Sequence, residues 1–314
     1  MKEVIQVTFG RKLLKRLLST IFVLFGISIV AFTLVRVAPG NPAKMMLPDT
    51  ATEEQIEAME EQMGLDKPYI VQYGTYMKNV LKGDLGYSYK FNMPVTELIA
   101  GRLPATAQLA AVALIWSSLF SITLGIIAGI KKGSGIDVFS MVFALVGQSV
   151  APVWLSLMLI LIFGVTLKWL PTQGYGGVKY IIMPAICMGF QFTAMITRMT
   201  RTGMVDVLQE DYIAATRARG ISKFKVYTRY ALKNTLLPVV TVMGNQLGNL
   251  LAGSAVIESV FSWPGMGQLL VTAINSRDLQ LVQSMLLVTA LIIAVTNLLV
   301  DILYTFIDPR ISLN

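Results

Sequence analysis

Histidine is absent from this chain of 314 residues, and cysteine occurs once, as Cys187. Without histidine, imidazole-based acid–base chemistry, catalytic triads that use an imidazole and histidine metal sites are excluded. A single cysteine also excludes a disulfide within the chain. Charge is scarce as well, since only 14% of the residues are Asp, Glu, Lys or Arg. An ordinary soluble domain has about 25%, so the composition indicates a membrane protein.

Long runs without charge define the predicted fold class. Six stretches contain no Asp, Glu, Lys or Arg: residues 17–35, 103–130, 138–167, 180–197, 234–257 and 279–300. Each has about 18 residues or more, enough to cross a hydrocarbon core of about 30 Å as a helix. The mean hydropathy is +0.64. We therefore predict an all-α membrane protein with six transmembrane helices, in which residues 138–167 form one tilted helix kinked near Pro152.

The net charge of +8 is distributed in a way that orients the chain in a membrane. With the N-terminus inside, 16 of the 26 basic residues fall in cytoplasmic segments, although the largest loop lies outside. They are Lys2, Arg11, Lys12, Lys15, Arg16, Lys131, Lys132, Arg198, Arg201, Arg217, Arg219, Lys223, Lys225, Arg229, Lys233 and Arg310. This excess is the positive-inside signature. It predicts that both termini are cytoplasmic, and it argues against a nucleic-acid partner.

Residues 37–101 form a predicted external region that is too long for a simple connector. A helix is expected over residues 52–63, with Thr52 as its N-cap and Gly64 as its stop. The tyrosines that follow are Tyr69, Tyr73, Tyr76, Tyr87 and Tyr89. Two interpretations remain open here: a small cap over the helix bundle, or a docking surface for a partner.

The sequence indicates a pathway without an energy source of its own. No G-x-x-x-x-G-K-[ST] phosphate loop occurs. No carboxylate is expected deep in a span, because Glu258 and Asp301 are predicted at helix ends and Asp137 before its span. Residues 245–256 place Asn245, Gln246, Asn249, Gly253 and Val256 on one helical face. These amides, with Gln191, either line the pathway or bond neighbouring helices.

A basic, helix-forming segment lies between two apolar runs, at residues 210–238 (EDYIAATRARGISKFKVYTRYALKNTLLP). We expect a short helix over residues 210–220 that Gly220 ends, with three alanines making a flat face that fits a groove on an energy-supplying partner. Ser222 is expected to cap a second helix over residues 223–234. Pro238 is expected at the start of the next span. The alternative is an ordinary amphipathic loop.

Short signatures in this order give the chain a family resemblance. They are RVAPGNP (36–42), GDLG (83–86), RLPAT (102–106), WLP (169–171), DY (211–212), ARG (218–220), Asn234, LLP (236–238), ESVF (258–261), WPGMG (263–267) and DPR (308–310). Together they cover essentially the whole chain. It resembles the ABC importer permeases of the dipeptide/oligopeptide/nickel permease family, and residues 210–238 resemble their EAA loop.

The resemblance implies a type I importer permease fold in a bacterial or archaeal cell membrane. Its expected parts are a cytoplasmic N-terminus with the first span (1–36), an extracytoplasmic region (37–101), a five-helix permease core (102–308) containing an EAA coupling loop (204–238), and a C-terminal tail (309–314). The implied function is peptide import. The alternatives are a cargo of nickel, a metal chelate or glutathione, an ATP-independent secondary transporter, and a membrane scaffold that transports nothing.

The resemblance also implies the partners: a second homologous permease, two cytoplasmic ATPases, an extracytoplasmic binding protein over residues 37–101 and 262–278, and membrane lipid. ATP and Mg would be bound by the ATPases, so no cofactor and no enzymatic activity are expected on this chain. The implied ATPase contacts are Glu210, Asp211, Tyr212, Ala214, Ala215, Arg217, Ala218 and Gly220. Tyr230 stands where many relatives carry histidine.

Overall fold

The computed structural model describes residues 2–37, 43–44, 47, 50–252 and 255–307, and these are mainly helical. The α-helices are α1 (Lys2–Val37), α3 (Glu53–Met63), α4 (Tyr69–Leu81), α5 (Val95–Ile130), α6 (Gly135–Ser149), α7 (Pro152–Leu159), α8 (Val178–Leu208), α9 (Asp211–Ala218), α10 (Lys223–Lys225), α11 (Leu232–Leu251), α12 (Ala255–Val260), α13 (Met266–Asn275) and α14 (Leu279–Ile307). Two π-helical segments, η1 (Ile160–Thr166) and η2 (Val226–Ala231), and two short strands, β1 (Tyr87–Ser88) and β2 (Met93–Pro94), complete them. The predicted helical fold is confirmed for these residues. The breaker run at 38–42, Gly253, and residues 308–314 with the DPR signature and the tail lie outside the described residues.

The chain divides into two compact units, of which the first holds residues 1–104 and 265–298. Its helix α3 begins and ends as predicted, because Thr52 and Gln55 form a reciprocal capping box and Gly64 closes the helix with a φ of 66°. Helix α4 is attached to α1 by tyrosines: Tyr69 donates to Thr33 at 2.7 Å, and Tyr73 shares a 2.8 Å hydrogen bond with Ser28. These tyrosines therefore attach α4 to α1.

A buried carboxylate joins the short hairpin of this unit to α14. The strands pair antiparallel, with Ser88 opposite Met93. Asp278 is fully buried, accepts a hydrogen bond from the Ser88 hydroxyl, and accepts the backbone N–H of Leu281 at 3.1 Å. It thus caps the first turn of α14. Nearby, burial raises the pKa of Tyr89 to about 12, so its hydroxyl stays protonated and donates to the Ser276 carbonyl.

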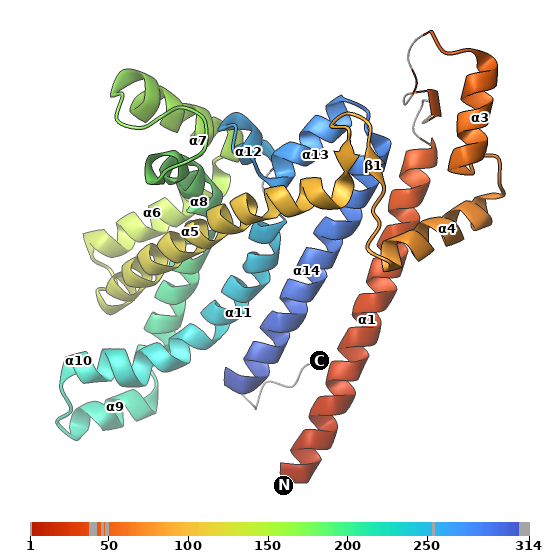
Figure 1. Ribbon diagram of the computed structural model, residues 1–314. Helices are drawn as coiled ribbons and strands as arrows, with labels where there is room; N and C mark the ends of the chain where they lie inside the picture. Colours follow the sequence, from red (N-terminus) through yellow and green to blue (C-terminus); the bar gives the residue numbers. More distant parts are fainter. Residues whose placement is uncertain (1, 38–42, 45–46, 48–49, 253–254, 308–314) are drawn as a thin grey trace. The chain divides into compact units, whose positions relative to one another are not determined.

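The second unit, residues 105–264 and 299–314, is built around α8. Figure 1 shows α9 and α10 together at one end of the helices α8 and α11, with α7 and α12 at the other end. Helix α8 lies close to α5 because two glycines of α5, spaced four residues apart, leave room for the side chains of α8. A Cβ on Gly125 would lie 2.6 Å from the Thr200 Cβ, and one on Gly129 would lie 2.5 Å from the Met204 Cβ. The missing side chains at these two positions thus allow the close contact between α5 and α8.

Among the described residues, four helices are long and apolar enough to cross a membrane. They are Arg16–Val37, Val95–Ile130, Val178–Leu208 and Leu279–Val300, and the bent pair described next makes a fifth if it counts as one span. The predicted run 234–257 does not form one helix, since α11 ends at Leu251 and α12 starts at Ala255. The count of six spans stays a prediction.

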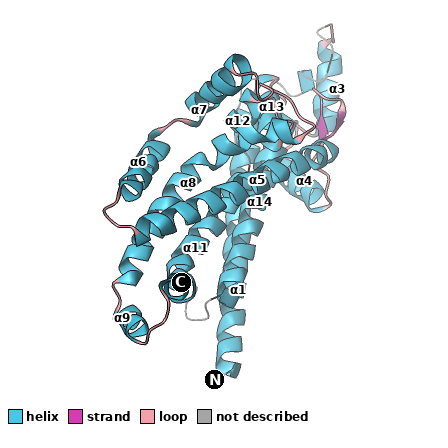
Figure 2. Cartoon of the chain, turned by 90° about the vertical axis from the view of Figure 1, so that its left-hand side faces the viewer, coloured by secondary structure: helices cyan, strands magenta, loops and turns pink. Residues whose placement is uncertain are grey.

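The prediction of one tilted helix over residues 138–167 is wrong. The chain forms Gly135–Ser149 and Pro152–Thr166, bent by 106° at the break between them. Figure 2 shows these two arms as α6 and α7, joined by a loop. The position of the break was predicted correctly, but its nature was not. Proline forces the preceding residue out of the helical region, and Ala151 is extended with a ψ of 134°. Pro152 therefore starts a new helix instead of kinking an old one.

We predict that Gly125→Leu destabilises the protein by about 1–3 kcal/mol, because the added side chain would overlap Thr200 and the Thr197 carbonyl. Thermal unfolding of the purified protein in detergent measures the change. Gly26→Leu is the matched control, since no atom lies within 4 Å of a Cβ at that position. Equal melting temperatures for the two variants would contradict the α5–α8 contact.

Candidate functional site

The candidate coupling site is centred on α9, whose ends match the sequence prediction. Glu210 occupies the N-cap position in an extended conformation, and its carbonyl accepts the Ile213 N–H at 3.0 Å. Gly220 follows the helix with a φ of 74°, a left-handed conformation that glycine adopts without steric cost. No other atom lies within 4 Å of a Cβ placed there, so backbone conformation alone explains the glycine.

Helix α9 has one buried face and one exposed face. Ile213 has no exposed surface, and Thr216 is 9% exposed. The exposed residues include all eight of the predicted ATPase contacts: Glu210, Asp211, Tyr212, Ala214, Ala215, Arg217, Ala218 and Gly220. Three small alanines with charges around them make a flat, open surface. The structure therefore brings the predicted residues together on one short element.

A small apolar cluster attaches α9 to the rest of the second unit. Its fully buried members are Ile213 of α9, Met204 of α8, and Val226 and Ala231 of η2. Burial of an isoleucine side chain contributes about 1.5–3 kcal/mol. Partly buried residues complete the cluster: Ile126, Ile130, Val207, Leu208, Ile221 and Tyr227. The cluster fixes the orientation of α9 against the end of α8.

A second attachment uses the hydroxyl of Tyr212. It accepts the side-chain amide of Asn234 at 2.8 Å and donates to the backbone carbonyl of Tyr230 at 3.3 Å. Although Tyr212 is 38% exposed, its polar atom is bonded to its own chain. At position 230 the acceptor is the backbone carbonyl. The bond therefore does not depend on whether the side chain there is tyrosine or histidine. Tyr212 therefore positions α9 as well as lying on its surface.

Two predictions about residues 222–238 are wrong. Ser222 lies at a helix N-cap, but its side chain makes no capping hydrogen bond. Pro238 does not start a helix, because it lies inside α11, which begins at Leu232. Helix α10, η2 and α11 follow one another without a gap from Lys223 to Leu251. Proline lacks the N–H that the Asn234 carbonyl would otherwise accept, a cost that the surrounding helix tolerates. The segment is therefore one continuous run of helix and not two separate helices.

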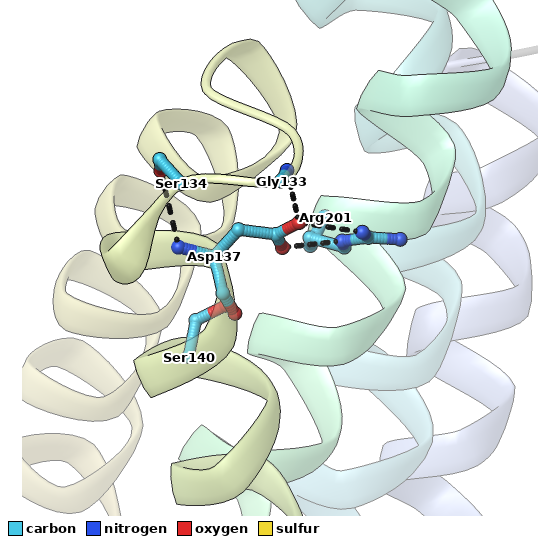
Figure 3. A network of polar contacts seen from close by, with 5 residues as sticks. All are labelled: Gly133, Ser134, Asp137, Ser140 and Arg201. Carbon is cyan, nitrogen blue, oxygen red and sulfur yellow. Dashed lines mark hydrogen bonds and ion pairs between the residues drawn. The ribbon is translucent and has the colours of Figure 1, made fainter.

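An ion pair that sequence reasoning missed connects α8 to the start of α6. The carboxylate of Asp137 accepts Arg201 Nε and Nη2, each at 2.8 Å, and the Gly133 N–H at 2.9 Å. Figure 3 shows these bonds, with Ser134 accepting the backbone N–H of Asp137. The two-pronged pairing is the strong geometry for arginine and carboxylate. Arg201 lies about one turn before Met204 of the cluster, so α6 is fastened to the helix that carries α9.

The predicted pathway amides do not form one group. Asn249 donates to Gln246 at 3.1 Å, and both lie on α11. Asn245 is exposed on the same helix. Gln191 belongs to α8 and donates to the Val150 carbonyl at 3.4 Å, at the break between α6 and α7. The structure thus joins two of the four amides and places Gln191 beside the bend.

The prediction for Glu258 needs a correction. This residue was expected at a helix end, but it has no exposed surface, and Thr106 donates to its carboxylate at 2.9 Å. The short helix α12 places it inside the second unit. Beside it, Trp263 is buried and donates its indole N–H to the Ala105 carbonyl at 2.9 Å. Polar bonds thus hold the signature around residues 258–263 against α5 at Ala105 and Thr106.

No group of three or more His, Cys, Asp or Glu side chains that could hold a metal ion occurs among the residues described. A cavity of about 820 Å³ in the second unit has walls that are mostly apolar and aromatic, including Trp116, Tyr175 and Trp263. The indole of Trp116 is bonded to the Ala185 carbonyl, and the hydroxyl of Tyr175 to Gln108. Because these polar atoms are already bonded, the aromatic residues offer mainly ring surface.

Known proteins resemble this chain over most of its length. Residues 121–313 match the family described as "Binding-protein-dependent transport system inner membrane component", and residues 9–110 match its N-terminal counterpart. The chain is similar to the dipeptide transport system permease protein DppB of Alkalihalophilus pseudofirmus, with 41% identity over 95% of this chain and 98% of that protein. It is similar to the glutathione transport system permease protein GsiC of Escherichia coli, with 40% identity over 95% and 97%. The fold resembles that of the inward-facing MetNI methionine ABC transporter, with a TM-score of 0.55 at 15% identity over 67% of this chain and 96% of that chain.

We predict that Asp137→Asn lowers the free energy of unfolding by about 1.5–3 kcal/mol, since it leaves the Arg201 guanidinium without its charged acceptor. The double variant Asp137→Asn/Arg201→Gln should cost less than the sum of the two single changes. Thermal unfolding in detergent gives these values. Asp66→Asn, at an exposed carboxylate, is the control. Additive losses would show that the pair makes no energetic contribution of its own.

Proposed function

Because the chain belongs to the family of binding-protein-dependent transport system inner membrane components, we propose that it imports peptides as a permease subunit of an ATP-driven transporter. The observation that carries this proposal is the exposed alanine face of α9, which the buried Ile213 holds in a fixed orientation. In this role the permease itself catalyses no reaction. It would convert movement of its partners into a change in the side of the membrane to which the pathway opens.

The proposed energy input is the docking of α9 into a groove of a cytoplasmic ATPase. Small alanine side chains let the helix approach a partner surface closely, and charges at its rim give orientation. Two ATPases, which hold ATP and Mg, would bind this chain and a second homologous permease. ATP binding would bring the ATPases together and move both docking helices. The cluster around Met204 and Ile213 would carry that movement into α8.

The proposed topology has six spans, with both termini in the cytoplasm of a bacterial or archaeal cell. Helix α11 would be the fifth span, with its amides turned away from lipid. The basic residues of α9, α10 and η2 would then lie at the inner membrane surface. Residues 37–101 would be extracytoplasmic and, with 262–278, would receive the binding protein. Residues 102–308 would form the permease core, with the coupling loop at 204–238.

Peptides are the proposed cargo for two reasons. The relatives are named for a dipeptide and for glutathione, which is itself a small peptide. The aromatic and aliphatic walls of the larger cavity suit apolar peptide side chains better than a bare metal ion. The amides at Gln191, Asn245, Gln246 and Asn249 would bond to the peptide backbone as it passes. Nickel and metal chelates remain alternative cargoes.

We predict that Ala215→Arg and Gly220→Pro abolish ATP-driven peptide uptake while leaving membrane insertion intact. The arginine would block close approach of the ATPase, and proline cannot adopt the positive φ at position 220. Uptake of a labelled dipeptide by proteoliposomes containing the full transporter measures the effect. Ala215→Ser keeps the side chain small, and asparagine tolerates the positive φ at position 220. Both the Ala215→Ser and the Gly220→Asn variants should therefore transport. Normal uptake with either disruptive variant would refute the coupling role.

We predict that Asn249→Leu changes the initial uptake rate severalfold and alters the preference between a dipeptide and glutathione, because it removes the amide that bonds Gln246. The measurement is competition between the two substrates in the same proteoliposomes, with the amount of inserted protein determined in parallel. If rate and preference both stay unchanged, these amides serve helix packing and not the pathway.

A further inference from the structure

A cavity of about 390 Å³ in the first unit is lined by both apolar and polar residues, and the transport mechanism does not use the polar ones. It lies between α1, α4, the start of α14 and the turn after α3. Two cations, Arg36 and Lys67, line it together with neutral donors, Tyr76 and Gln283 among them. No aspartate or glutamate belongs to this lining.

Arg36 is held in a fixed orientation by its neighbours. Its Nε donates to the Gln72 side-chain oxygen at 2.8 Å, and its guanidinium lies 4.8 Å from the centroid of the Phe32 ring. Gln72 is fixed in turn, because its amide nitrogen donates to the carbonyls of Leu65 and Lys67 at 3.0 and 2.8 Å. Arginine has five N–H donors, and this arrangement uses one of them. The others form no hydrogen bond with the described residues, and the guanidinium pairs with no carboxylate there.

Two buried donors in the same cavity lack partners. Gln283 is only 2% exposed, yet its side-chain nitrogen has no hydrogen bond within the described chain. The hydroxyl of Tyr76 is likewise buried without one. Burial raises the pKa of Tyr76, and the neighbouring Gln283 side chain lowers it by a smaller amount, so the two side chains lie close together. An unsatisfied buried polar atom costs about 1–3 kcal/mol. A ligand that accepts hydrogen bonds from these atoms would therefore stabilise the folded protein.

The unmet groups specify the chemistry of that ligand. Guanidinium, ammonium and amide nitrogens are all donors, and two of the three carry positive charge. Their complement is a compact anion with several acceptor oxygens, such as a phosphate, for which arginine and lysine are the usual partners. Acyl chains also have a place nearby. Phe25 and Ile29 lie on the same face of α1 as Arg36, about three and two turns before it, and are 50% and 40% exposed.

We propose that this cavity binds the phosphate headgroup of a phospholipid, whose acyl chains follow the apolar face of α1. The position supports a lipid over a diffusible anion, because Arg36 is next to the last residue of an apolar span. A headgroup there would join α1, α4 and α14 through one ligand. The proposal does not depend on which cargo the permease carries.

Native mass spectrometry of the full chain in detergent tests the proposal, with dioleoylphosphatidylglycerol as the probe. We expect the wild-type protein to retain this lipid and to ignore dioleoylglycerol, which has the same chains without phosphate. Arg36→Gln should weaken retention about tenfold, since a charge-assisted hydrogen bond is lost. Arg36→Lys keeps the charge and should restore part of it. Lys78→Gln, at an exposed cation of α4 outside the cavity, should change nothing.

A second variant separates binding from folding. Gln283→Leu removes a buried amide nitrogen that has no hydrogen-bond partner, so lipid-free protein should be at least as heat-stable as wild type, while lipid retention falls. Equal retention by Arg36→Gln and wild type would overturn the proposal. Displacement of the lipid by millimolar inorganic phosphate would overturn the lipid assignment and identify a small-anion site. Displacement by an acidic surface of the binding protein would overturn it in favour of a protein contact.

Discussion

The burial of a single side chain, Ile213, is the constraint on which the candidate coupling site depends. Helix α9 has eight residues, which is too short for a helix to be stable alone in water. Its outer face consists of alanines and charged residues that gain little from folding. The fully buried Ile213 and the hydrogen-bonded Tyr212 hydroxyl therefore supply most of its attachment. A partner that displaces α9 must displace the end of α8 and η2 as well.

That attachment gives two routes by which a displacement of α9 would pass to the rest of the second unit. One runs along α8 from Met204 to Arg201, whose ion pair with Asp137 holds the first arm of the bent helix pair. The other passes through η2 into α11 without a break, and α11 carries the bonded amides Gln246 and Asn249. A continuous helical segment and a salt-bridged helix would both transmit displacement, so a small movement of α9 would reach the proposed pathway.

Local features could be predicted from the sequence, and long-range ones could not. The N-cap at Thr52, the stop at Gly220 and the alanine face of α9 depend on residues a few positions apart, and all three were predicted. The 106° bend was missed because an apolar run has the same composition whether it is straight or broken. The Asp137–Arg201 pair and the burial of Glu258 against Thr106 join residues far apart in sequence, which no local pattern reveals.

The central claim is that the alanine face of α9 is covered by an ATPase in the assembled transporter. Labelling of an Ala215→Cys variant with a small maleimide tests it directly, because the native Cys187 is buried. The account predicts rapid labelling of the permease alone and strong protection when the ATPases are present. A Lys225→Cys variant, on the exposed α10, should be labelled equally in both states. Equal labelling of the Ala215→Cys variant in the bare permease and in an active, ATPase-bound transporter would contradict the account.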